Sequence, residues 1–237
     1  MITQQDILNA TAYVNNVNIF DVGALVQSFK VSGTAISNTA YQGVNSTGFN
    51  VLSTTRGMRT ISLTLGYKGI TKRDLAFKKA KLDAMLGAGK IELYLPDGFF
   101  YTSYMTGVGE EAVQGVEGNK VIALCTYTLQ GIRHDELEEL TVTSGDTFLC
   151  ASLIPTTDCR LTCTASQAYA SLTIGSVTVT SVTQGDVITV DGINKRILQN
   201  GAPCAGNMSF INFPQLVPGE NTISCPETLT VEYYPTY

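Results

Sequence analysis

The sequence predicts a mainly β protein with two domains, each built from antiparallel strands, and with a single α-helix in the first domain. Many segments alternate apolar and polar residues, which is the pattern of half-buried strands, and turn dipeptides such as Asn200-Gly201 and Pro218-Gly219 separate them. Only the stretch 72–86 has helical spacing. Charged residues make up 15% of the chain, below the roughly 25% typical of globular proteins. This is usual for a threonine-rich β protein, or for a protein that hides much of its surface in an assembly.

The first domain is expected over residues 1–135. Strands are predicted around Tyr13–Phe20 and over Leu25–Val31. The segment 32–55 is polar and contains glycines, so it is interpreted as a loop or an extended hairpin arm. The clearest strand is Arg59–Tyr67, in which every second residue is apolar.

The helix is predicted over residues 72–86. Thr71 supplies a hydroxyl for the N-cap, and Asp74 three residues later makes an acidic variant of the capping box. Gly87 or Gly89 is expected to end the helix. The apolar stripe consists of Leu75, Leu82, Met85 and Leu86.

A hairpin and a long strand are expected to complete the first domain. The hairpin joins Lys90–Leu95 to Phe99–Thr106 through the turn Pro96-Asp97-Gly98. Residues 107–118 are rich in glycine and acidic side chains, and are therefore interpreted as a loop. The strand Lys120–Arg133 follows.

The second domain is predicted to be an antiparallel β-sandwich over residues 136–237. The charged segment Asp135–Glu139 is expected to act as the hinge before it. Short strand-like runs separated by turn residues are typical of a sandwich. These runs are Leu140–Thr143, Thr147–Ser152, Arg160–Thr164, Ala170–Ile174, Val177–Val182, Val187–Val190 and Leu229–Tyr233.

The charge differs between the two predicted domains. Residues 1–135 have a net charge of +2 and residues 136–237 a net charge of −7. The second domain therefore lacks the clustered cations with which proteins neutralise nucleic-acid phosphates. The chain shows neither the pattern of a secretory leader nor the roughly 18 uninterrupted apolar residues of a membrane span. We therefore expect a protein that is made in the cytoplasm and leaves it, if at all, by lysis.

The six cysteines do not predict a metal site. Cys159 and Cys163 are the only close pair, and two strand residues at this spacing lie about 13 Å apart. His134 is the sole histidine, so a tetrahedral zinc site would need four converging cysteines. Reduced, buried cysteines that pack in the core are the favoured interpretation, with disulfides and then zinc as alternatives.

The sequence predicts no catalytic, cofactor-binding or metal-binding residue. His134 lies in a charged segment and is expected to be solvated, and no Gly-x-Ser-x-Gly motif accompanies it. The carboxylate pairs Glu110-Glu111 and Glu138-Glu139 belong to segments interpreted as solvated, and adjacent residues point in different directions. The expectation is therefore a protein that is not an enzyme and binds no cofactor.

The end of the chain contains an ordered set of motifs. Val190-Asp191-Gly192 precedes Asn200-Gly201, then Phe213–Asn221 reads FPQLVPGEN, and Tyr233-Tyr234-Pro235 follows a strand. This order resembles the C-terminal module of the distal tail (Dit) proteins of long-tailed siphophages. The first half, with its strands, arm, single helix and hairpin, is similar to the N-terminal domain of that family in architecture.

The resemblance implies a structural virion component. A distal tail protein is a hub at the tail tip, in the baseplate, that links the tail tube to receptor-binding and other host-attachment proteins. The resemblance also implies a homo-hexameric ring formed by residues 1–135, through which phage DNA passes without specific binding. The C-terminal sandwich, similar to galectins and carbohydrate-binding modules, would face outward. The protein would be located in the tail tip of the virion, after assembly in the cytoplasm of the bacterial host, with no membrane partner.

Two other functions remain open from the sequence. A glycan-binding adhesin-type module would use exposed aromatic side chains on the sandwich. The chain has no Trp, so the candidates are Tyr169, Tyr233, Tyr234 and Tyr237. A tail tube protein would share the combination of strands and one helix, but has no need of an acidic C-terminal sandwich. The host and the identity of the attached receptor-binding proteins are not predicted.

Overall fold

A computed structural model describes residues 12–41, 47–48, 50–204 and 206–237. The part of the predicted N-terminal segment that precedes residue 12 lies outside the described residues, as does part of the predicted arm.

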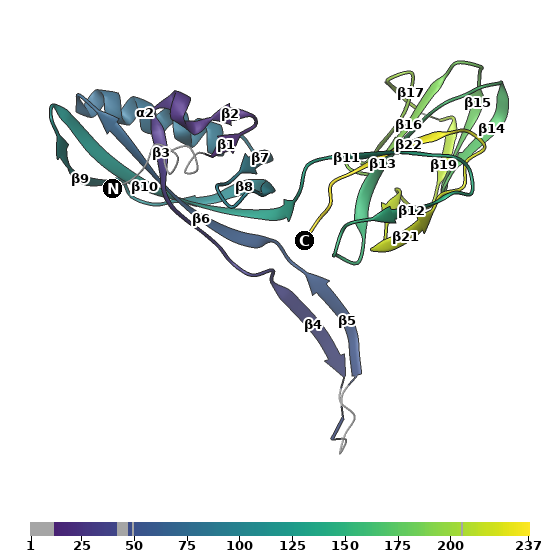
Figure 1. Ribbon diagram of the computed structural model, residues 1–237, viewed down its shortest axis with the longest axis horizontal. Helices are drawn as coiled ribbons and strands as arrows, with labels where there is room; N and C mark the ends of the chain where they lie inside the picture. The colour runs from purple at the N-terminus through teal and green to yellow at the C-terminus, as the bar shows by residue number, and fades with distance from the viewer. Residues whose placement is uncertain (1–11, 42–46, 49, 205) are drawn as a thin grey trace. The chain divides into compact units, whose positions relative to one another are not determined.

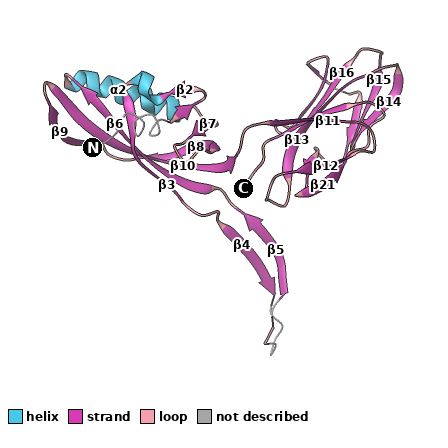
Figure 2. Ribbon diagram, in the orientation of Figure 1, coloured by secondary structure: helices cyan, strands magenta, loops and turns pink. Residues whose placement is uncertain are grey.

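Two compact units make up the chain, Met1–Arg133 and His134–Tyr237. Strands form most of each unit, and the first unit contains the helix α2 (Lys72–Leu86) (Figures 1 and 2). The predicted fold class, mainly β with a single helix in the N-terminal part, is confirmed for the described residues.

An eight-stranded sheet is the framework of the first unit. Its order is β2-β1-β7-β8-β10-β6-β3, and β9 pairs with β10 beside this path. Figure 1 shows α2 lying along this sheet. The strands are β1 (Tyr13–Val14), β2 (Val17–Asn18), β3 (Ala24–Val31), β6 (Arg59–Gly69), β7 (Ile91–Tyr94), β8 (Phe100–Val108), β9 (Ala112–Glu117) and β10 (Lys120–His134).

The alternation in β6 and β10 explains where the core lies. Leu63 pairs with Tyr127 and Leu65 with Cys125, so the buried residues of the two strands line one face. The helix covers this face with the three residues of its stripe that are buried in the same cluster, Leu75, Leu82 and Leu86.

The helix begins as its sequence predicts. The backbone N–H of Asp74 donates to the Thr71 hydroxyl over 3.1 Å, which satisfies one of the free N–H groups of the first turn. The Asp74 carboxylate accepts the N–H of Ile70, also at 3.1 Å, instead of the Thr71 N–H that a standard capping box would use. Gly87 follows the last turn as the C-cap.

Two predictions for the first unit are wrong. The expected strand Tyr13–Phe20 is a tight hairpin, β1 and β2, followed by the 3₁₀ helix η1 (Ile19–Val22). Asn15 and Asn16 have φ values of 49° and 64°, the left-handed conformation that a two-residue hairpin turn requires. The expected loop 107–118 contains β9, because pairing with β10 outweighs the poor strand propensity of its glycine and charged residues.

The predicted arm is a hairpin. Strands β4 (Ile36–Tyr41) and β5 (Asn50–Arg56) pair with each other in a two-stranded sheet of their own. Of the two readings of this segment, the structure therefore selects the hairpin over the loop.

The second unit is built from three sheets around one core. A seven-stranded sheet has the order β11-β22-β13-β16-β17-β18, with β20 paired to β13, and the others are β14-β15-β19 and β12-β21. One hydrophobic cluster joins residues from these sheets, as expected for a sandwich. The strands are β11 (Glu138–Val142), β12 (Thr147–Cys150), β13 (Thr157–Thr164), β14 (Tyr169–Ile174), β15 (Val177–Val182), β16 (Val187–Asp191), β17 (Arg196–Gln199), β18 (Ala202–Pro203), β19 (Met208–Phe210), β20 (Gln215–Leu216), β21 (Gly219–Thr222) and β22 (Leu229–Tyr233).

Two of the predicted turns near the chain end are confirmed. Asn200 and Gly201 have φ values of 51° and 78° and connect β17 to β18. Gly219 has a φ of 86°, as the third position of a type II turn after Pro218 requires. Gly192, by contrast, has no positive φ. In the turn that follows Gly192, Lys195 adopts the left-handed conformation, with a φ of 56°.

Candidate functional site

The outer face of the seven-stranded sheet presents a row of threonines. Thr141, Thr230, Thr162 and Thr189 are successive cross-strand partners on β11, β22, β13 and β16. The Thr162 hydroxyl lies 3.4 Å from that of Thr189 and donates to it. Residues that alternate with them, such as Leu161, are buried in the core. This face is therefore polar because the polar residues of the alternating strands point to it. None of the four threonine side chains is a strong acid or base.

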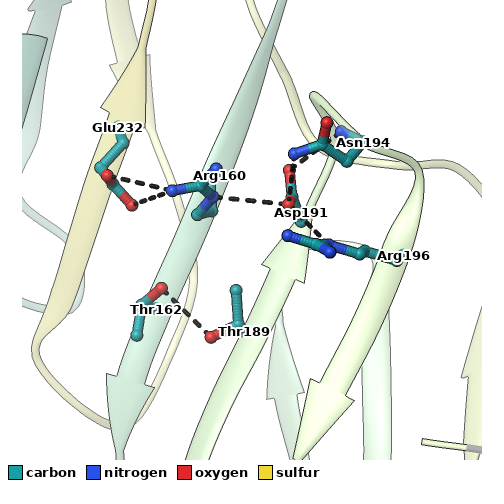
Figure 3. A network of polar contacts seen from close by, with 7 residues as sticks. All are labelled: Arg160, Thr162, Thr189, Asp191, Asn194, Arg196 and Glu232. Atoms are coloured by element: carbon teal, nitrogen blue, oxygen red, sulfur yellow. Dashed lines mark hydrogen bonds and ion pairs between the residues drawn. The ribbon is translucent and has the colours of Figure 1, made fainter. Parts of the chain in front are cut away.

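A charged row runs beside the threonine row (Figure 3). Arg160 Nη1 lies 3.2 Å from both carboxylate oxygens of Glu232, and Arg160 Nε lies 3.5 Å from Asp191 Oδ2. Asp191 also accepts hydrogen bonds from the backbone N–H of Asn194 at 3.0 Å, from its Nδ2 at 2.8 Å, and from Arg196 Nε at 3.0 Å. The network thus ties β22, β13, β16 and β17 together.

Asp191 is the centre of this network and its side chain is fully buried. Burial by itself would raise the pKa of the carboxyl, but the hydrogen bonds from Asn194 and Arg196 and the nearby Arg160 charge lower it below its ordinary value. The carboxylate is therefore ionised, with its charge already used by fixed partners. Such a group orders a turn and a sheet, and has no proton to exchange at neutral pH.

Gly192 follows Asp191 and explains the third letter of the Val-Asp-Gly motif. A Cβ at this position would lie 2.6 Å from the carbonyl oxygens of both Cys159 and Pro214. The Gly192 N–H donates to that Cys159 oxygen at 2.9 Å. The glycine is required because two backbone segments approach it closely.

The basic residues of the second unit are all engaged in ion pairs. Besides the two arginines of the network, Lys195 Nζ lies 2.8 Å from Asp158 Oδ1. Residues 134–237 contain these three basic residues and eleven acidic ones, so their net charge is −8. The net charge of residues 1–133 is +3. The second unit therefore has an excess of negative charge that its own cations do not balance.

The hairpin β4–β5 exposes several large apolar side chains of the first unit. Every residue of β4 is exposed, and four large apolar side chains are each at least half exposed: Ile36, Tyr41, Val51 and Leu52. Among the described residues β4 and β5 pair with no other strand, and a two-stranded sheet by itself has little independent stability.

The base of this hairpin is well anchored. The Gly57 N–H donates to the Ala35 carbonyl at 2.7 Å, and the Ser32 N–H donates to the Thr60 carbonyl at 2.8 Å. The Thr60 N–H donates in return to the Ser32 hydroxyl at 2.8 Å. The arm thus leaves the core from a defined point.

The cysteines lie in the cores. All six are buried and none is in a disulfide. Burial raises the pKa of Cys159 to about 12. The pKa of Cys163 is also raised, mainly by its hydrogen bond with Cys225 and to a smaller extent by burial. Among the described residues, no three His, Cys, Asp or Glu side chains converge as metal ligands.

His134 differs from its prediction, because it is only 3% exposed. Its ring meets the Tyr234 ring edge-on, with 4.8 Å between centroids, and Nδ1 lies 2.7 Å from the Asp135 carbonyl oxygen. Its backbone forms a bridge with Thr236 near the chain end. A local charged sequence does not reveal this long-range pairing.

Three of the four tyrosines considered for sugar stacking make contacts within the second unit. Tyr233 is fully buried, and its hydroxyl donates to Glu138. Tyr234 packs against His134, and the Tyr169 hydroxyl donates to Glu227 at 2.7 Å. In the described part of the chain, no helix is long and apolar enough to cross a bilayer.

The sequence predicts no site residue, and it does not reveal the charged network around Arg160 that the fold assembles. The Arg160 network joins residues that are far apart in the chain, and only the strand register brings them together. The strand alternation gives no signal for it, because Asp191 shares the outer face of β16 with Thr189, while Ile188 and Val190 face the core.

Comparison with known proteins supports an assignment. Residues 154–237 match the family described as siphovirus-type tail component, C-terminal domain. No curated protein sequence gives a match. The crystal structure of the SPP1 Dit (gp 19.1) protein, described as a paradigm of the hub adsorption apparatus in phages that infect Gram-positive bacteria, has a TM-score of 0.73 and 13% sequence identity, and covers 96% of this chain and 98% of that one.

Two structures of the phage P2 baseplate also match. The activated conformation with Ca contains a chain with a TM-score of 0.58 and 7% identity, covering 96% of this chain and 98% of that one. The activated conformation with Sr gives 0.51 and 8%, with coverage of 93% and 97%. Identities this low establish a shared fold. Together with the match over residues 154–237, they confirm the resemblance to the distal tail family.

Proposed function

Because the C-terminal unit matches a siphovirus-type tail component, we propose that this chain is the structural hub of a phage tail tip. In this role it joins the tail tube to the baseplate and to the host-recognition proteins, and it is not an enzyme. The observation that supports the proposal most directly is the likeness to a hub protein over 96% of the chain, which includes both units.

In the proposed assembly the first unit forms a homo-hexameric ring. The exposed apolar residues of β4–β5 are suited to packing against a neighbouring copy. Phage DNA would pass through the ring without specific binding. The second unit would hold the receptor-binding and other tail-tip proteins. The protein would be located in the virion after assembly in the host cytoplasm.

Light scattering combined with electron microscopy tests this proposal. Six copies of a 25.4 kDa chain give a particle of about 150 kDa. We expect this mass and a ring with a central opening at micromolar concentration. A strict monomer at high concentration would contradict the hub function, and stacked tubes would indicate a tail tube protein instead.

Removal of residues 33–54 tests the proposed role of the arm. This deletion takes away most of both hairpin strands and leaves the paired strands of the core sheet intact. We expect the far-UV circular dichroism and the urea midpoint of the remaining chain to be kept, whereas the oligomer dissociates. A full-size oligomer formed by the deletion variant would exclude the arm as the assembly element.

A further inference from the structure

A cavity lies on the outer face of the second unit, where β13 and β22 run side by side. Its volume is about 370 Å³. It lies at one end of the threonine row and on the same face. Its lining consists of Thr162, Cys163, Thr164, Glu227, Thr228 and Thr230.

Glu227 carries the only carboxylate in this lining and is held in a fixed position. Glu227 is 8% exposed. Oε1 accepts three hydrogen bonds, from the Ser166 N–H at 2.7 Å, the Ser166 hydroxyl at 2.8 Å and the Tyr169 hydroxyl at 2.7 Å. All three donors reach the same oxygen, and within the described ranges Oε2 accepts no hydrogen bond.

The carboxylate is ionised. Burial would raise the pKa of Glu227, but the hydrogen bonds from Tyr169 and Ser166 outweigh this effect and lower the pKa below its ordinary value. Glu227 Oε2 is not among the buried atoms that lack a partner, so this oxygen is accessible and can accept from a donor outside the unit.

In the described part of the second unit, no lysine or arginine forms an ion pair with Glu227 Oε2. Arg160 and Arg196 are held by Glu232 and Asp191, and Lys195 is held by Asp158. The excess negative charge of residues 134–237 attracts a cation over a longer range. The lining therefore includes one carboxylate, fixed through Oε1 and without a cation of the same unit, together with four threonines.

We propose that this cavity receives a lysine or arginine side chain of a partner protein in the tail tip. The cation would donate to Glu227 Oε2 and to the hydroxyl groups of the threonines in the lining, and its aliphatic stem would lie against their methyl groups. This inference rests on the proposed hub function, and it identifies the chemistry by which the second unit holds a neighbour.

Methyl NMR of the full chain, with ¹³C-labelled threonine methyl groups, tests the proposal at any oligomeric size. Four threonines line the cavity, so their signals report binding directly. The probes are the blocked tripeptides acetyl-Gly-Lys-Gly-amide and acetyl-Gly-Arg-Gly-amide. Acetyl-Gly-norleucine-Gly-amide is a control with a similar stem and no charge, and lactose tests for a sugar site.

We expect saturable shifts of these four signals with a cationic tripeptide, at roughly millimolar affinity because a single side chain is bound. Glu227→Gln should weaken the binding about tenfold or more, since a charge-assisted hydrogen bond is lost. Glu139→Gln is the matched control, because it changes the net charge equally at an exposed position of the same unit, and it should have no effect. Thr228→Arg, at an exposed position of the lining, should place a cation in the cavity and block the probes.

Other results would overturn the proposal. Equal binding by the Glu227→Gln and wild-type chains would show that the carboxylate is not the receptor. An equal loss with Glu139→Gln would show only general attraction to an acidic unit, and shifts with lactose but not with the cationic tripeptides would indicate a sugar site. If the chain forms the hexamer but binds neither cationic tripeptide, the proposed binding of a cation in the cavity is refuted and the hub function is not. If the chain is a monomer that binds them, the hub function is refuted and cation binding is not.

Discussion

Substitution of Asp191 by Asn tests whether the charged network on the outer sheet face stabilises the second unit. The change keeps the shape of the side chain and removes its charge. The fully buried carboxylate accepts from Asn194 and Arg196 at 2.8–3.0 Å and lies 3.5 Å from Arg160. In asparagine one carboxylate oxygen is replaced by an N–H₂ group, which donates hydrogen bonds. The donors that this oxygen accepted from therefore lose their acceptor.

The expected loss can be estimated from these contacts. Breaking a buried ion pair costs about 3–5 kcal/mol, because the remaining charge is left without compensation. Here Arg160 keeps Glu232 on its other side, and the remaining amide oxygen of the substituted side chain still accepts from one donor, so the lower end applies. We therefore expect a loss of about 3 kcal/mol in the free energy of unfolding at pH 7.

Urea unfolding followed by far-UV circular dichroism measures this change. With a slope of about 1–3 kcal/mol per molar urea, the transition of the second unit should move down by roughly 1–3 M. Glu139→Gln is the control, because its side chain is exposed and carries the same charge; its effect should stay within about 0.5 kcal/mol. A loss below about 1 kcal/mol for Asp191→Asn, or one equal to the control, would refute the reasoning.

The pH dependence gives an independent check of the same prediction. The folded-state pKa of Asp191 is lowered, so its stabilising contribution is complete above the unfolded-state pKa of about 3.9. It is lost as the pH falls through the folded-state value. The difference between wild type and Asp191→Asn should therefore shrink in acid, and a difference that grows below pH 4 would contradict the assigned sign.

Three further predictions concern a close backbone approach, the buried thiols and a buried tyrosine hydroxyl. Gly192→Ala should destabilise the second unit by about 2 kcal/mol or more, because its Cβ would meet two carbonyl oxygens at 2.6 Å, whereas Gly33→Ala, with open space around it, should change the urea midpoint little. The native protein should not react with Ellman's reagent at pH 8, since all six thiols are buried and the pKa of Cys159 is about 12; fast labelling without denaturant would count against the cores described. Tyr127→Phe should cost about 1 kcal/mol in urea unfolding, because the buried hydroxyl donates to Asp83 at 2.9 Å, and no change would mean that this hydrogen bond contributes nothing.

Local patterns in the sequence determine much of the secondary structure. The alternation of Arg59–Tyr67 predicts β6 because successive side chains of a strand point to opposite faces. Thr71 and the apolar stripe after it predict α2, since capping and helical spacing act within a few residues. The turns at Asn200-Gly201 and Pro218-Gly219 depend on backbone preferences of those residues alone. In the same way, the order of the motifs at the chain end points to the distal tail family without any contact being known.

Other features depend on which strands become neighbours, and only the tertiary structure decides them. The Gly-rich segment 107–118 contains a strand because β10 offers a free edge to it. His134 is buried because the chain end pairs with it. Gly192 is needed because two distant segments approach it, and Glu227 lines a cavity that β13 and β22 create together. Burial and close approach result from contacts between residues far apart in the chain, and no local pattern encodes the register that brings them together.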